Sequence, residues 1–251
     1  MLLEPSVTTL TPLTQSNDFI HIYTADPAVV LCDEIIEHSE QGEWDRSKVI
    51  GFDEPNLDER DSHQQSYWAY DFPDVHRSML GFASDCLNNY LEAFPQANQQ
   101  PSFSVAEHYQ VLRYLDGGAY HAVHTDYYPY GPVLSRRHLT GVGFLNDVKT
   151  GGQLLFPQQN FFVNPEAGKF VIFPSGWTHA HKTLPPVGQS RYVFQMWWSF
   201  DEEVRYWLLS TAGTRTRLLG LRSYRGPTPS LTPYIASARM GKYRQADPLR
   251  S

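Results

Sequence analysis

His124 and Asp126 are the residues whose types and spacing most directly suggest chemistry. Residues i and i+2 of an extended segment point to the same side, so this imidazole and this carboxylate converge on one point. A His-x-Asp pair also arises by chance, and a surface turn explains it equally well. A second histidine-bearing segment, 177–181 (WTHAH), follows the apolar run 168–174. Two histidines and one carboxylate form the facial ligand set typical of non-haem iron(II), which leaves coordination positions open.

Arg191 lies ten residues after His181 and opens an apolar run, RYVFQMWWSF. Its guanidinium offers a planar two-donor fork that matches a carboxylate and stays charged when it is buried. Strand alternation gives Val193, Gln195 and Trp197 the same direction as Arg191. These four residues are therefore expected to share one face of a strand.

The elements that must position these residues are helices followed by strands. Helices are expected at 26–42, where Asp26-Pro27 suits a helix start, and at 75–94, where apolar residues recur every three or four positions. Short apolar runs separated by glycine and proline predict strands at 19–23, 103–115, 138–146, 152–156, 161–163, 168–173 and 191–200. This order predicts an α+β fold, mainly β, with a jelly-roll core that N-terminal helices support.

A chain of 251 residues of this kind is expected to form one domain, 1–251. Residues 1–100 would supply helical support and a lid loop at 42–70, which is polar, acidic and without a clear motif. Residues 101–200 would form the core. Residues 201–251 carry 9 Lys+Arg against 4 Asp+Glu, whereas residues 1–200 carry 11 against 23. Because the basic residues are scattered, we expect this extension to pack on the acidic body or to stay mobile, and we do not expect it to bind nucleic acid.

The composition describes an ordinary globular protein, with 41% hydrophobic and 19% charged residues. No run approaches the roughly 20 apolar residues that cross a bilayer, and the first residues lack a basic, apolar leader pattern. Cys32 and Cys86 both lie in segments that are expected to be helical, which argues against a disulfide framework. We therefore expect a cytoplasmic protein without a membrane partner.

Three segments taken in order resemble the prolyl 4-hydroxylase-like branch of the iron(II)/2-oxoglutarate dioxygenase superfamily. They are YQVLRYLDGGAYHAVHTD, RHLTGVGFLNDVKTGGQLLFP and NPEAGKFVIFPSGWTHAHKTLPPVGQSRYVFQMWW, within about residues 103–199. The resemblance implies a double-stranded β-helix, the jelly-roll and cupin-like fold. It also implies that His124, Asp126 and His181 bind Fe(II) and that Arg191 anchors the distal carboxylate of 2-oxoglutarate. Many prolyl hydroxylases have lysine at this last position, so arginine is a departure.

The resemblance suggests further co-substrate residues, each with a plainer interpretation. Tyr114 matches a position where the family offers a tyrosine hydroxyl to 2-oxoglutarate, although a core tyrosine is nearly as good an explanation. Thr140 and Leu145 would line the co-substrate pocket, although a packed strand interior explains them equally well. His179 could compete with His181 for the metal, but its tenth following residue is Gln189, which supplies no positive charge. His179 is therefore expected to be a supporting or substrate-side residue. His121 is a second unassigned histidine, three residues before His124.

The implied activity is hydroxylation of an unactivated C–H bond, in a prolyl residue of a peptide or in a free amino acid or small molecule. Fe(II), 2-oxoglutarate and O₂ would be required, with ascorbate as an optional reductant, and succinate and CO₂ would be the co-products. One alternative is a cupin-like hydrolase or isomerase that uses the same His/Asp/His site, and another is a non-catalytic jelly-roll binding module. Arg191 and the complete ligand set favour the oxygenase. The oligomeric state is left open.

Overall fold

The structure is a computed structural model, and it describes residues 13–49, 53–99, 101–129 and 131–201. The described residues all belong to the unit Met1–Trp207. The predicted basic extension 201–251 lies outside the described residues, apart from Asp201. None of the helices in this described part has the length and hydropathy that a membrane-spanning helix needs.

The long helix α2 (Arg77–Ala93) forms where the apolar spacing predicts it. Its buried face consists of Met79, Phe82, Ala83, Cys86 and Tyr90. These residues recur at helical intervals. The helix ends at Ala93, because the capping residue Phe94, which precedes Pro95, has a non-helical conformation. The short 3-10 helices η1 (Asp74–His76) and η2 (Pro95–Gln99) flank α2.

The first helix, α1 (Cys32–Glu40), begins later than the predicted start at Asp26. Oδ1 of Asp26 accepts a hydrogen bond from the backbone N–H of Ala28 at 3.0 Å, and residues 27–31 form turns. Leu31 has a φ of 56°, in the left-handed region, which interrupts the helical path. Asp26-Pro27 therefore opens a turn that leads into the helix.

The larger sheet has the strand order β1-β2-β10-β7-β12-β6-β4-β3, and β5 pairs with β12. Its strands are β1 (Leu13–Asn17), β2 (Ile20–Thr24), β3 (Asp45–Arg46), β4 (His63–Tyr67), β5 (Phe103–Ser104), β6 (Tyr109–Tyr114), β7 (Arg137–Phe144), β10 (Lys169–Pro174) and β12 (Arg191–Phe200). All of these pairings are antiparallel. The smaller sheet has the order β11-β8-β9, from β11 (Lys182–Thr183), β8 (Leu154–Phe156) and β9 (Phe161–Val163).

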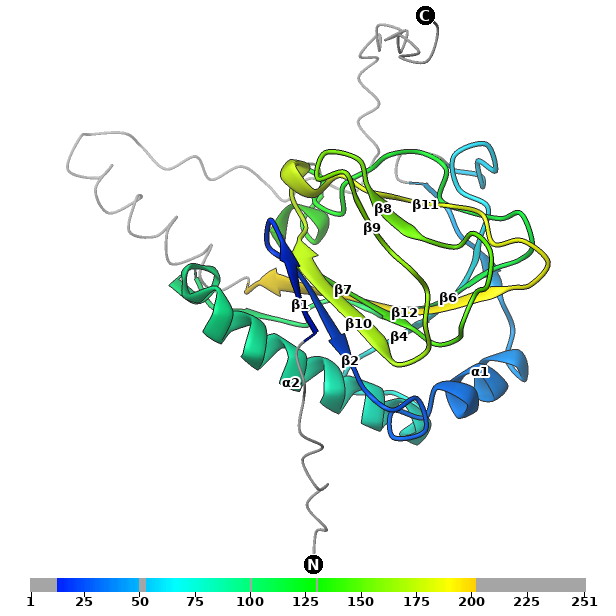
Figure 1. Cartoon of the computed structure of the whole chain (residues 1–251), viewed down its shortest axis with the longest axis horizontal. Helices are drawn as coiled ribbons and strands as arrows, with labels where there is room; N and C mark the ends of the chain where they lie inside the picture. Colours follow the sequence, from blue (N-terminus) through cyan, green and yellow to red (C-terminus); the bar gives the residue numbers. More distant parts are fainter. Residues whose placement is uncertain (1–12, 50–52, 100, 130, 202–251) are drawn as a thin grey trace, which may run out of the picture. The chain divides into compact units, whose positions relative to one another are not determined.

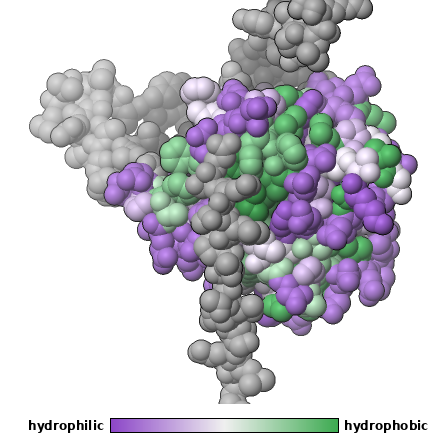
Figure 2. All heavy atoms as spheres, in the orientation of Figure 1, coloured by the Kyte–Doolittle hydropathy of each residue, from purple (hydrophilic) through white to green (hydrophobic). Residues whose placement is uncertain are grey.

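Strand alternation in the larger sheet separates two cores. On β12, Phe194, Met196 and Trp198 pack against α1 and α2, whereas Val193 packs on the opposite face with residues of the smaller sheet. Figure 1 shows the two helices on one side of the larger sheet and the smaller sheet on the other. Two antiparallel sheets in this arrangement form a double-stranded β-helix, as the sequence predicts. Figure 2 shows hydrophobic residues near the middle of the face in view, with hydrophilic residues around them.

The segment expected as one long loop, 42–70, contains two strands that extend the larger sheet. Strand β4 pairs with β6 along its whole length, and β3 pairs with β4. The sequence of β4, HQQSY, lacks apolar alternation, so only its pairing with β6 identifies it as a strand. Strand β1, which is not among the predicted strands, pairs with β2. The expected lid loop is therefore interrupted by two strands.

Candidate functional site

His124 and His181 lie side by side because their backbones pair. They form an isolated antiparallel bridge in which each N–H donates to the other residue's carbonyl oxygen, at 2.9 and 2.8 Å. His181 precedes β11, and His124 lies in the segment between β6 and β7. Directly opposed residues in such a pair place their side chains close together, and the two ring centroids are 4.4 Å apart. Backbone register thus brings two imidazoles to one point.

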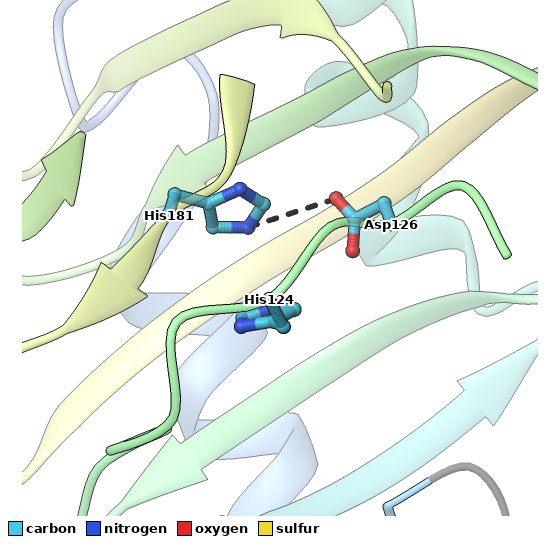
Figure 3. A group of neighbouring side chains, drawn as sticks. All are labelled: His124, Asp126 and His181. Carbon is cyan, nitrogen blue, oxygen red and sulfur yellow. Dashed lines mark ion pairs between the residues drawn. The ribbon is translucent and has the colours of Figure 1, made fainter. Parts of the chain in front are cut away.

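Asp126 completes the group, as the i, i+2 spacing from His124 predicts. Nε2 of His181 is 3.8 Å from Oδ2 of Asp126, and one ligand atom from each of the three residues lies within 4.8 Å of the others. Figure 3 shows the three side chains facing a common space. Two imidazole nitrogens and a carboxylate oxygen at this separation can hold a divalent transition metal.

Hydrogen bonds orient both imidazoles with the same nitrogen toward this space. Nδ1 of His124 lies 3.2 Å from the carbonyl oxygen of Ala122, and Nδ1 of His181 lies 3.0 Å from that of His179. A carbonyl only accepts, so each Nδ1 carries a hydrogen, and in the neutral ring this tautomer leaves the lone pair on Nε2. Burial, followed by the proximity of His181, lowers the pKa of His124 to about 3, so its ring is neutral.

Asp126 is buried, and its carboxylate is kept ionised by its neighbours. Burial by itself raises the pKa of Asp126, but His181, His124, Arg137 and a hydrogen bond from Thr140 together lower it below its ordinary value. That hydrogen bond runs from Oγ1 of Thr140 to Oδ2 at 2.8 Å. An ionised carboxylate is the form of Asp126 that metal binding needs.

A cavity of about 580 Å³ opens onto the three residues. Its wall includes Asp45, Arg46, Lys48, Glu54, Arg60, Gln110, Tyr114, Tyr120, Val142, Leu154, Thr183 and Arg191 together with His124, Asp126 and His181. The predicted common direction of Val193, Gln195 and Trp197 is confirmed, because all three line this cavity with Arg191. The volume is in the usual range for a small-molecule site.

Arg191 is 2% exposed, and its charge has no counter-ion in the described part of the chain. One of its N–H groups, on Nη1, donates to the carbonyl oxygen of Gly152 at 2.9 Å, whereas Nε has no hydrogen-bond partner there. The guanidinium carbon lies 4.4 Å from the ring centroid of Tyr114 and 5.8 Å from that of Phe144. Burying an unpaired guanidinium is costly, so the arrangement calls for an anionic ligand.

Among the other predicted co-substrate residues, only Tyr114 lines the cavity. It is the cross-strand partner of Arg191 on β6. Thr140 is buried and bonds Asp126, and it is not part of the cavity wall. Leu145 packs in the core between the sheet and the helices, which corrects its assignment to the pocket. Thr140 and Leu145 are separated by an odd number of positions, so an alternating strand sends them to opposite faces.

The two ambiguous histidines lie outside the group. The ring of His179 is held by Oγ1 of Thr178 at 2.9 Å and the carbonyl oxygen of Asp18 at 2.5 Å, and its own carbonyl orients His181. It therefore supports His181, as one of the two predicted roles requires. His121 is exposed and does not line the cavity.

Arg137 is a site residue that the sequence reasoning did not assign. Nη1 of Arg137 donates to the carbonyl oxygen of Asp126 at 3.2 Å, and its guanidinium carbon lies 3.6 Å from the Trp197 ring centroid. Glu107 binds it with both carboxylate oxygens, at 2.8 and 2.5 Å. The only sequence signal was a charged residue at the head of a buried strand.

The fold and the site define a double-stranded β-helix protein with a candidate metal site of the two-histidine, one-carboxylate type. Residues 109–199 match the sequence profile of the 2OG-Fe(II) oxygenase superfamily. The matched segment contains all three candidate metal ligands and Arg191, so this part of the chain is similar to a superfamily that is named for Fe(II) and 2-oxoglutarate.

Solved structures with the same fold include several prolyl hydroxylases. The 2OG complex of a viral collagen prolyl hydroxylase from Paramecium Bursaria Chlorella virus-1 has a TM-score of 0.55 at 16% identity, over 73% of this chain and 97% of that one. A Pseudomonas putida prolyl-4-hydroxylase has a TM-score of 0.54 at 18% identity, over 72% of this chain and 92% of that one. A Trichoplax adhaerens prolyl hydroxylase in complex with a hypoxia inducible factor peptide fragment has a TM-score of 0.58 at 19% identity, over 75% of this chain and 86% of that one. No curated protein sequence matches this chain.

Proposed function

We propose that this chain hydroxylates a C–H bond in a prolyl residue of a peptide or in a free amino acid or small molecule, with Fe(II) held by His124, Asp126 and His181. In the overall reaction the C–H bond, O₂ and 2-oxoglutarate give C–OH, succinate and CO₂, so one oxygen atom enters each organic product. The observation that carries the proposal is one cavity with three metal-ligand atoms within 4.8 Å and an uncompensated buried guanidinium.

Different residues of the cavity would bind the metal and the co-substrate. Bound Fe(II) would supply the redox chemistry that activates O₂. Arg191 would bind the distal carboxylate of 2-oxoglutarate with its fork, and the Tyr114 ring beside it would limit where that carboxylate lies. The carbonyls of Ala122 and His179 would hold the two imidazoles in the binding tautomer.

The alternatives explain less of the site. A cupin-like hydrolase or isomerase would use the same three ligands, but it has no need of a buried guanidinium without a counter-ion. A non-catalytic module would not need the hydrogen bonds that prepare each ligand. The Trichoplax adhaerens neighbour holds a peptide, which supports a peptide as one substrate class. A cytoplasmic location is part of the proposal, and the buried free thiols of Cys32 and Cys86 suit it.

The proposal is tested by measuring Fe(II)-dependent conversion of 2-oxoglutarate to succinate by the purified protein. The Asp126→Ala variant should lose this activity by more than about 100-fold, since even residues that only support a ligand cost 10- to 100-fold. Circular dichroism of the variant should remain close to that of the wild type. Normal succinate formation by a folded Asp126→Ala protein would remove Asp126 from the ligand set.

A further inference from the structure

Four arginines line the cavity, and they differ in whether a carboxylate neutralises them. They are Arg46, Arg60, Arg137 and Arg191. Arg46 pairs with Asp61, and Arg137 pairs with Glu107. Neither Arg60 nor Arg191 has a carboxylate within 4.0 Å in the part of the chain that the structure describes. Arg191 is assigned to the co-substrate, so Arg60 is left without an anion.

The position of Arg60 is fixed by its neighbours. Its backbone forms an isolated bridge with Tyr120, and its guanidinium carbon lies 5.1 Å from the centroid of that ring. Nε donates to Oγ of Ser62 at 3.0 Å, and Nη1 approaches the carbonyl oxygen of Lys48 at 3.5 Å. A guanidinium has five N–H donors, so donors remain for a ligand. Arg60 is therefore a preorganised cation on the cavity wall.

Tyr120 connects Arg60 to the metal ligands. Its ring stacks on the ring of His124, with centroids 3.5 Å apart and planes 12° apart. Arg60 thus contacts an aromatic ring that itself contacts a ligand. If Arg60 binds the carboxylate of a ligand, the rest of that ligand would lie close to His124. Arg191 lies at a different place, at the head of β12 beside Tyr114.

We propose that Arg60 binds a carboxylate of the substrate, so that the substrate is an amino acid with a free carboxylate or the C-terminal residue of a peptide. This inference rests on the proposed function. An internal prolyl residue is flanked by neutral amides and would leave Arg60 without a counter-ion. Asp45 and Glu54 line the same cavity without a paired cation in the described residues, and they would suit the ammonium group of a free amino acid.

The substrate class is tested with a panel of compounds added to the Fe(II)- and 2-oxoglutarate-loaded protein. The panel contains the twenty free amino acids and matched proline peptides in three forms: proline internal, proline C-terminal with a free carboxylate, and proline C-terminal but amidated. We expect at least one carboxylate-bearing compound to stimulate succinate formation and to gain one oxygen atom by mass. Amidation should remove the effect. The free amino acids and the C-terminal peptides distinguish the two sources of carboxylate.

The role of Arg60 is tested by binding as well as turnover. The compound that stimulates most is titrated into protein loaded with Mn(II) and 2-oxoglutarate, and its Kd is measured by calorimetry. Arg60→Gln should raise the Kd by about tenfold or more, as expected for losing a charge-assisted hydrogen bond. Arg60→Lys, which keeps the charge, should recover part of the loss. Arg46→Gln is the matched control, because it removes a cavity-wall charge that Asp61 already neutralises, and its Kd should change much less.

Each result bears on one of the two proposals. Stimulation by internal or amidated proline as strong as by free carboxylates would overturn the role of Arg60, and so would equal effects of Arg60→Gln and Arg46→Gln. Basal 2-oxoglutarate turnover without stimulation by any carboxylate compound would overturn it as well. Absence of all Fe(II)-dependent succinate formation would instead contradict the proposed function.

Discussion

Thr140 links the central strand of the larger sheet to the candidate metal site. Its hydroxyl donates to Oδ2 of Asp126 at 2.8 Å and lies 2.8 Å from Oγ of Ser175. All three residues are buried, so this hydrogen bond is shielded from water. The contact fixes the rotamer of the one carboxylate in the group and favours its ionised form.

Replacing Thr140 with valine keeps the shape of the side chain and removes the donor. We expect the affinity for Mn(II) to fall by about 10- to 100-fold, because a residue that orients a metal ligand typically has an effect of this size. The affinity can be measured from the free Mn(II) signal in electron paramagnetic resonance. Thr150→Val, at an exposed position, should bind Mn(II) like the wild type. Equal affinities for the two variants would show that Asp126 needs no orienting donor.

At the scale of elements, strand β7 leaves space for core side chains of its two neighbouring strands. Gly141 on β7 is paired with Ile172 on one side and with Met196 on the other. A Cβ atom at Gly141 would lie 2.7 Å from Cζ of Phe170 and 2.9 Å from Cζ3 of Trp198. The missing side chain therefore makes room for two core aromatic rings.

We expect Gly141→Ala to lower the free energy of unfolding by about 1–3 kcal/mol, the usual cost of overpacking a filled core. Gly81→Ala is the control, because a Cβ there meets nothing within 4 Å and alanine favours helix by about 1 kcal/mol over glycine. The two substitutions should thus have opposite signs in urea denaturation. A stabilising effect of Gly141→Ala would mean that the rings of Phe170 and Trp198 move aside freely.

The junction between η1 and the sheet contains a buried histidine, His76. Nδ1 of His76 lies 2.8 Å from the hydroxyl of Tyr109, and the ring packs against Tyr67 and Phe194. Burial, followed by the proximity of His38, lowers the pKa of His76 from 6.5 to about 4. The folded protein therefore keeps this ring neutral in a pH range where the unfolded chain protonates it.

Stability should fall as the pH drops from about 6.5 toward 4, because the unfolded state binds the extra proton in this window. Between pH 6.5 and 4.5 we expect this histidine to account for about 2 kcal/mol of lost unfolding free energy. Over the same pH range, the unfolding free energy of the His76→Phe variant should fall by about 2 kcal/mol less than that of the wild type, whatever the variant's stability at neutral pH. Parallel stability–pH curves for the two proteins would contradict the assignment.

At the scale of the whole molecule, ligand binding and stability are linked through Arg191. A diacid at 100 times its Kd should stabilise the Mn(II)-loaded wild type by about 2.7 kcal/mol. The Arg191→Met variant should lose this response to 2-oxoglutarate and keep the response to Mn(II), which differential scanning fluorimetry can measure. Without ligands the variant should be at least as stable as the wild type, since it no longer buries an unpaired charge. A retained response to 2-oxoglutarate would remove Arg191 from the co-substrate site.

The sequence by itself determined the features that depend on local spacing. Alternation along 191–200 placed Arg191 and Trp197 on one face, and the i, i+2 spacing placed His124 beside Asp126. Helical periodicity located α2 in the same way. These patterns are visible because the residues that share a face are close in the chain.

Tertiary structure alone decided the features that join distant segments. The polar strand β4 is a strand only because it pairs with β6, and His124 lies beside His181 only through their backbone bridge. Folding also determines whether a charge is neutralised: Arg137 pairs with Glu107, which is 30 residues away in the sequence. Arg60 is distinguished from Arg46 only by what folding places next to it. Strand register and charge pairing depend on residues far apart in the chain, so local sequence patterns do not predict them.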